Sequence, residues 1–136
     1  MSGTPDRPAP GPRVDARRTI TVAPADCATQ WGNDDLEVLS TPAILGHMER
    51  LCVTAVAPHL RSGQMTVGVS VEMRHLAPTP VGEKVEFHIT TALTGRRFTV
   101  TFTAADSAGR VLATGTHDRA IVDEAAFRAR IGGPAS

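Results

Sequence analysis

The sequence predicts an α+β fold in which an antiparallel sheet wraps around one long helix. The first observation is a segment over residues 42–57 whose apolar residues recur at helical spacing. The second is a change of period, because four segments from residue 64 onward alternate apolar and polar residues, as strands with one buried face do. The third is that short, turn-rich connections join these strands, which favours antiparallel hairpins.

The predicted helix carries one residue that does not fit its pattern. We expect it to begin at Thr41, a good N-cap, with Pro42 in the first helical position, and to end near Pro58. Its apolar arc is broad, which indicates burial against a sheet. Glu49 lies on the flank of this arc, and no residue of opposite charge stands three or four positions away on the helix. A lone Glu on a flank is more often partly exposed, but this one is also a candidate site residue.

The strands follow the helix in order, after a first strand within residues 17–24 and an irregular polar stretch. They are expected within residues 64–77, 83–93, 97–105 and 110–122, and Asp123 is expected to cap a short last helix over residues 123–131. In the first of them, strict alternation places Met65, Val67, Val69, Val71 and Met73 on one face. This arrangement is the hotdog fold, an antiparallel five-stranded sheet wrapped around one long central helix. Such a sheet leaves a long edge that these folds usually cover by pairing, so we expect a homodimer.

Composition limits the kinds of partner. The chain has 136 residues, with 14 basic and 14 acidic, so we expect one domain over residues 16–131 between a Pro-rich disordered tail (1–15) and a short tail (132–136), and no nucleic-acid partner. No apolar run is long enough for a membrane span and no secretory signal is evident, so we expect a cytoplasmic protein without a membrane partner. Cys27 and Cys52 lack the spacing of metal ligands or of a disulfide framework, so we expect two buried thiols and no metal.

Several residues could carry chemistry. By alternation His75 shares the apolar face of its strand and points toward the helix of Glu49, so these two titratable groups are expected to meet. Gly68 interrupts a β-branched strand, which marks either a bulge or a close approach to the backbone. Arg119 is either an exposed strand residue or a cation aimed at the site, and His117 is ambiguous in the same way.

Three segments, residues 40–60, 66–87 and 115–122, resemble the fluoroacetyl-CoA thioesterase family of single-domain hotdog thioesterases. The shared features are a Thr and a Glu eight positions apart on the helix, the strand glycine, the motif H-x-x-x-T-P-x-G and the motif G-T-H-x-R. The resemblance covers residues 16–131. It implies hydrolysis of an acyl-CoA or acyl-carrier thioester, with coenzyme A as part of the substrate and no other cofactor. On this resemblance Thr41, Glu49 and His75 fall on catalytic positions, and Gly68 and Arg119 fall on two further active-site positions.

The chemistry suits these residue types. Glu49 would act as nucleophile or as general base, His75 would position a water or exchange protons, and Thr41, besides its expected capping role, would hydrogen-bond the carbonyl or the water. The two phenylalanines of the family's lid are replaced by Gly32 and Asp35, so the resemblance implies the reaction class and not the fluorinated substrate. Two alternatives remain at this point: a hotdog protein that binds an acyl thioester without cleaving it, and a hotdog hydratase or dehydratase.

Overall fold

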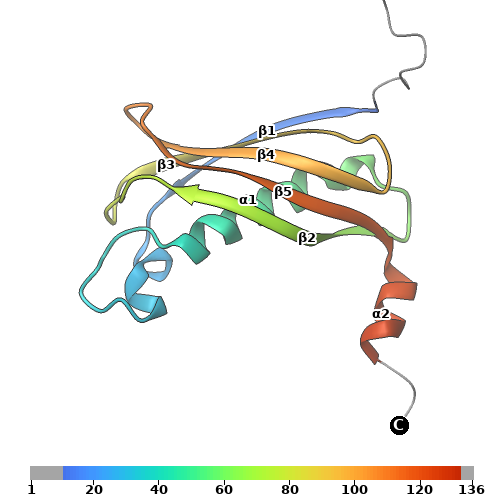
Figure 1. Cartoon of the computed structure of the whole chain (residues 1–136), viewed down its shortest axis with the longest axis horizontal. Coiled ribbons are helices and arrows are strands. Elements are labelled where there is room, and N and C mark those ends of the chain that lie inside the picture. The colour runs from blue at the N-terminus through green and yellow to red at the C-terminus, as the bar shows by residue number, and fades with distance from the viewer. Residues whose placement is uncertain (1–10, 133–136) are drawn as a thin grey trace, which may run out of the picture.

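The computed structural model describes residues 11–132, in which one antiparallel sheet packs on one long helix (Figure 1). The strand order is β1-β3-β4-β5-β2. The predicted α+β architecture, with five strands around a central helix, is confirmed. The elements are β1 (Arg13–Thr21), the short 3-10 helices η1 (Pro24–Asp26) and η2 (Ala28–Trp31), α1 (Thr41–Val56), η3 (Ala57–His59), β2 (Gln64–His75), β3 (Lys84–Ala92), β4 (Arg97–Asp106), β5 (Val111–Asp123) and α2 (Glu124–Gly132).

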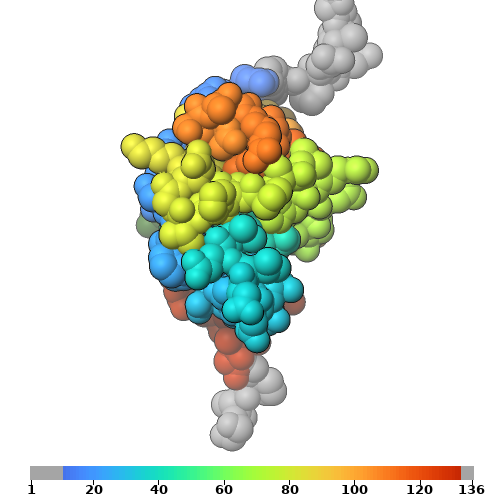
Figure 2. All heavy atoms as spheres, turned by 90° about the vertical axis from the view of Figure 1, so that its left-hand side faces the viewer, coloured from blue at the N-terminus to red at the C-terminus, as the bar shows by residue number. Residues whose placement is uncertain are grey.

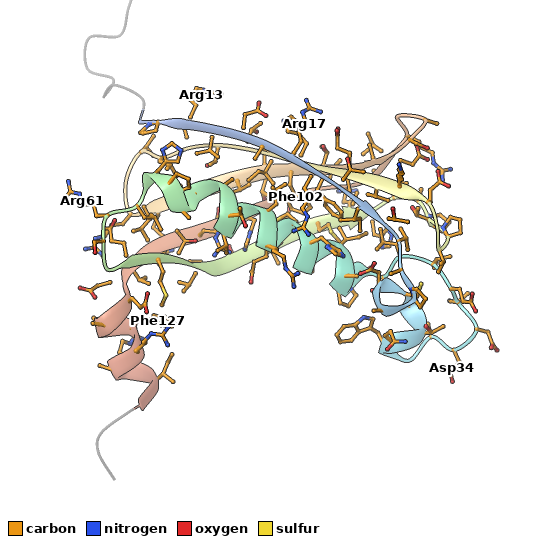
Figure 3. The ribbon with its side chains drawn as sticks, turned by 180° about the vertical axis from the view of Figure 1, so that it is seen from behind. Arg13, Arg17, Asp34, Arg61, Phe102 and Phe127 are labelled. Carbon is orange, nitrogen blue, oxygen red and sulfur yellow. The ribbon has the colours of Figure 1, made fainter. Side chains whose placement is uncertain are left out.

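The core lies between α1 and the sheet. Figure 3 labels Phe102 of β4 in this layer, where it is buried together with Met48 and Cys52 of α1. Cys27 and Cys52 are both free and buried, as predicted. Burial raises the pKa of the Cys52 thiol to about 11, so this cysteine behaves as a small apolar side chain.

The first strand begins earlier than expected. β1 pairs with β3 from Arg13 opposite Ala92 onward, and Val14 is buried, so backbone pairing and burial extend the strand into the segment predicted as a tail. At the other end of the chain, α2 runs to Gly132. The remainder of the predicted tails, residues 1–10 and 133–136, lies outside the described residues.

The start of α1 corrects the predicted cap. Ser40, not Thr41, is the N-cap: its backbone is extended and its hydroxyl accepts a hydrogen bond from the Ala43 amide at 3.2 Å. Thr41 is therefore already the first helical residue, which leaves its hydroxyl free for another partner. The predicted cap of α2 is confirmed, because Asp123 Oδ1 accepts a hydrogen bond from the Ala125 amide at 2.9 Å.

A bulge in β2 corrects the predicted alternation. Gly68 pairs with Arg119 and Ser70 with Asp118 on β5, so Val69 is one extra residue in β2. Thr66 and Gly68 face α1 before the bulge, where they contact Arg119 and Glu49, and Met73 and His75 face it afterwards. Met65 and Val67 therefore do not share a face with Met73, because an inserted residue reverses the parity of a strand.

The two edges of the sheet differ in character. Along β1 the exposed side chains include Arg13 and Arg17, which Figure 3 labels, and such charges discourage strand pairing. β2 forms the other edge, and there Val69 and Val71 are 45% and 47% exposed. Among residues 11–132, no helix combines the length and hydrophobicity needed to cross a lipid bilayer.

The cap assignment can be tested by comparing two neighbouring substitutions. Ser40→Ala should lower the free energy of unfolding by about 1 kcal/mol, because an amide at the helix start loses its acceptor. Thr41→Ala should change it by less than about 0.5 kcal/mol, since Thr41 is exposed and does not cap. Urea unfolding followed by circular dichroism measures both, and a larger loss for Thr41→Ala would contradict the assignment.

Candidate active site

The first group of predicted site residues is the Thr41–His75 pair. Thr41 opens α1 and His75 ends β2, and the Thr41 hydroxyl shares a hydrogen bond of 2.9 Å with His75 Nδ1. Both residues are exposed. The pair therefore presents a hydroxyl and an imidazole to solvent, two groups that can bind a carbonyl oxygen or a water and pass a proton.

The second group, called the Glu49 cluster below, consists of Glu49, Gly68, His117 and Arg119. Glu49 Oε1 lies 3.4 Å from Arg119 Nη1 and 3.8 Å from His117 Nε2. The Glu49 side chain is 56% exposed, whereas those of Arg119 and His117 are 2% and 5% exposed. The cluster thus holds one reachable carboxylate beside a buried guanidinium and a buried imidazole.

Arg119 is fixed by the neighbouring strand. Its Nε and Nη2 donate hydrogen bonds to the Thr66 hydroxyl, and Nη2 also donates to the Thr66 carbonyl oxygen at 2.9 Å. Nη1 is buried and makes no hydrogen bond within the described residues. A guanidinium stays charged even when buried, so it needs a compensating charge, and the Glu49 carboxylate supplies it. This explains why Glu49 has no partner on its own helix.

His117 is a site residue that the sequence reasoning left undecided. Burial, and next the charge of Arg119, lower the pKa of its imidazole, so the ring is neutral near pH 7. Among residues 11–132, its buried Nδ1 finds no hydrogen-bond partner, while Nε2 faces Glu49. The signal that could have found it is its position two residues before Arg119, which places both side chains on one face of the strand.

Gly68 closes the cluster from the β2 side, and both interpretations of it hold. It lies at the bulge, and it also lies close to the cluster. A Cβ atom at this position would lie 3.0 Å from His117 Nε2 and 3.3 Å from Glu49 Oε1. Any larger residue would press on a buried ring that has little room to move. Glycine therefore leaves open the space above the carboxylate.

The expected meeting of Glu49 and His75 is wrong for a single chain. No hydrogen bond or ion pair joins them in the described part of the chain; His75 binds Thr41, and Glu49 pairs with Arg119. Thr41 and Glu49 lie about 12 Å apart along the helix axis, at about 1.5 Å per residue. Gly68 and His75 lie about 20 Å apart along β2, because they span six residues of the paired strand β5 at about 3.3 Å per residue. The predicted residues therefore form two separate groups in one chain, the Thr41–His75 pair and the Glu49 cluster, called half-sites below.

The neutral state of His117 has a measurable consequence. Because its pKa is lowered from 6.5 in the folded protein, the unfolded chain binds an extra proton below that pH, and stability falls as the pH falls through and below 6.5. His117→Gln should remove this contribution, so its unfolding free energy should depend less on pH between about 7.5 and 5, by up to about 1.4 kcal/mol per pH unit. His47, His59, His75 and His88 are present in both proteins, so their contributions cancel in the comparison. Equal slopes would show that His117 is not held neutral.

The comparisons with known proteins agree with this geometry. A family model described as fluoroacetyl-CoA-specific thioesterase matches residues 22–125. The fluoroacetyl-CoA thioesterase of Streptantibioticus cattleyicolor is 35% identical over 98 residues, which span 70% of this chain and 68% of that protein.

Solved structures give the same result. A variant of the fluoroacetyl-CoA thioesterase FlK in complex with acetyl-CoA is 27% identical, with a TM-score of 0.79 over 92% of this chain and 98% of that one. A hot-dog-like protein from Thermanaerovibrio acidaminovorans is 30% identical, with a TM-score of 0.79 over 90% of each chain. These matches confirm the hotdog fold and, of the three interpretations drawn from the sequence, support the acyl-CoA thioesterase. The chain belongs to the fluoroacetyl-CoA-specific thioesterase family.

Proposed function

We propose that this protein hydrolyses acyl-CoA thioesters to a free carboxylic acid and coenzyme A, with Glu49 as the reacting carboxylate. The observation that carries the proposal is the pairing of a solvent-accessible Glu49 with a buried Arg119 at 3.4 Å. The guanidinium is anchored by Thr66, so it fixes the position of Glu49 Oε1 while the carboxylate stays open to substrate. A carboxylate held in this way is suited to act on an incoming thioester.

The reaction needs one bond formed and one broken. An oxygen nucleophile adds to the thioester carbonyl carbon, the carbon–sulfur bond breaks, and the sulfur leaves as a thiolate that takes up a proton. Because a thiol has a pKa near about 8.5, the leaving group needs little assistance. Glu49 supports the addition in one of two ways. It accepts a proton from the attacking water, or its own carboxylate attacks the carbonyl carbon and water then hydrolyses the resulting anhydride.

The remaining groups have complementary tasks. The Thr41–His75 pair hydrogen-bonds the carbonyl oxygen or the attacking water and returns a proton to the departing thiolate. Gly68 keeps space free for the acyl carbon above the carboxylate. Coenzyme A enters as part of the substrate, and the proposed chemistry uses no other cofactor.

Glu49→Gln is the direct test. The substitution keeps the shape of the side chain but removes its basicity, so kcat for thiol release from acyl-CoA should fall by about 10²–10⁴-fold. Glu86→Gln is the matched control, since Glu86 also pairs with an arginine, Arg17, but both side chains are exposed near the opposite edge of the sheet. The control should keep full activity. Full activity in Glu49→Gln would refute the assigned role, and no thiol release by the wild-type protein would refute the proposed function.

Single-turnover hydrolysis in ¹⁸O-labelled water tests for a nucleophilic Glu49. Label in the Glu49 carboxylate requires an anhydride that water opens at the glutamyl carbonyl carbon, whereas a general base, or an anhydride opened at the acyl carbon of the substrate, leaves the label in the product acid alone. Mass spectrometry of the peptide that contains Glu49 gives the answer.

We further propose that two copies of the chain pair through β2 and that each active site combines their half-sites. β2 exposes Val69 and Val71 besides the charged Glu72 and Arg74, whereas the exposed residues of β1 are only Arg, Asp and Thr, so β2 is the edge better suited to a partner. A two-fold axis midway between Gly68 and His75 would join antiparallel β2 strands and bring each Glu49 cluster beside the partner subunit's His75. This pairing would complete a site whose halves are separate in one chain.

Mixing two inactive variants tests the combined site. If Glu49 and His75 of one site come from different subunits, a heterodimer of Glu49→Gln and His75→Ala chains contains one intact site and one doubly damaged site. Random mixing of refolded chains should then restore about a quarter of wild-type activity, because half the dimers are mixed and each has one of two sites intact. Activity no higher than that of either variant alone would place both residues of a site on one subunit.

A cytoplasmic location is also proposed. The two cysteines are buried as free thiols and form no disulfide with each other, which suits a reducing compartment.

A further inference from the structure

A hollow lies beside the Thr41–His75 pair, between the segment that precedes α1 and the end of β2. Its volume is about 340 Å³. Trp31, Val38 and Pro42 contribute apolar surface, and the polar residues that line it are Asn33, Ser40, Thr41 and His75. Figure 2 looks at this end of the molecule, where the segment before α1 (cyan) lies beside the connection from β2 to β3 (yellow). A largely apolar hollow with a few polar groups is the usual form of a small-molecule site.

The walls of this hollow are held in place by long-range contacts. Asp26 Oδ1 lies 2.8 Å from His47 Nε2 on α1, which pins the segment to the helix. The Ser40 amide donates to the Asp26 carbonyl oxygen at 2.8 Å, and the Leu39 amide donates to the Thr79 carbonyl oxygen at 2.7 Å. The hollow is therefore already formed without a ligand.

Trp31 is the unusual wall residue. It is the only tryptophan of the chain, and it is 60% exposed although a large aromatic side chain is normally mostly buried. It ends η2, where Gly32 takes a left-handed backbone with φ of 97° and stops the turn. The indole ring thus stands on a fixed turn beside the Thr41–His75 pair, with apolar surface left for a ligand to cover.

We propose that this hollow takes the acyl group, and that the enzyme favours uncharged apolar acyl chains of about six to eight carbons. This inference rests on the proposed thioesterase function. At roughly 30 Å³ per heavy atom, the share of a water molecule in liquid water, an acetyl group would fill only a small part of the hollow. Each further methylene that is buried against Trp31, Val38 and Pro42 should raise kcat/KM about fourfold until the hollow is full.

The surroundings of His75 fit a thioester placed in this way. A second hollow of about 220 Å³, lined by Leu76, Ala77 and Pro78, shares Val38 and His75 with the first. An acyl chain in the first hollow and the thiol arm in the second would place the scissile bond at His75. Neither hollow is lined by Asp, Glu, Lys or Arg, so a carboxylate on the acyl chain would meet no lysine or arginine and could only hydrogen-bond to uncharged groups such as Asn33 and Ser40.

The test compares acyl-CoA substrates on three proteins. Wild type, Trp31→Ala and Leu36→Ala are assayed for thiol release from acetyl-, butyryl-, hexanoyl-, octanoyl- and succinyl-CoA. Leu36 is the matched control, because it is an exposed apolar residue of the same segment that does not line the hollow. Wild type should prefer hexanoyl-CoA to acetyl-CoA by at least about tenfold in kcat/KM and should be poorest with succinyl-CoA. Trp31→Ala should reduce that preference severalfold, mainly through KM, and Leu36→Ala should leave it unchanged.

The outcomes separate this inference from the proposed function. Hydrolysis of acetyl-CoA at least as fast as hexanoyl-CoA, or an equal effect of Trp31→Ala on every substrate, would overturn the acyl assignment and leave the thioesterase intact. Absence of thiol release from every substrate would overturn both. As an independent check, Val38→Phe fills part of the hollow and should shift the preferred acyl chain to a shorter one.

Discussion

The buried guanidinium of Arg119 is the constraint on which the rest of the site depends. A charge that cannot be neutralised must find partners inside the protein, and these come from two other elements: Thr66 on β2 and Glu49 on α1. Because Thr66 and Glu49 must both reach this guanidinium, the register of β2 against β5 and the rotation of α1 above the sheet are fixed. Gly68 is tied to the same constraint, because its lack of a side chain lets the carboxylate and the guanidinium meet beside β2.

The bulge at Val69 lets a single strand, β2, contribute to both half-sites. Thr66 and His75 are nine residues apart, so in a regular strand their side chains would lie on opposite faces. One extra residue reverses the parity, and both then face α1. Arg119 thereby obtains its anchor while His75 reaches the start of the same helix. The free valines beside the bulge leave this edge open to the pairing proposed above.

The spacing of apolar residues predicted most of the fold from the sequence. The change from helical spacing to strict alternation depends only on which side chains must be buried. The predictions that failed concern local features, such as the helix cap and the strand bulge, for which the sequence offers two nearly equal alternatives. Ser40 and Thr41 are adjacent residues that both can cap, and only the extended backbone of Ser40 decides. The bulge left one weak sign in the sequence, Gly68 itself. Glu49 and His75 were paired by chemistry, whereas distance along α1 and β2 keeps them apart in one chain.

In the proposed scheme, the residues that perform the reaction are separate from those that select the acyl group. The Glu49 cluster is built on α1, β2 and β5 and rests on buried groups, so a substitution there disturbs stability as well as chemistry. The hollow at Trp31 is walled largely by the segment before α1, which is attached through Asp26, Ser40 and Leu39. Changes between these attachment points can reshape the hollow without moving Arg119. The capping role of Ser40 serves the same division, because it anchors the segment and leaves the Thr41 hydroxyl to His75.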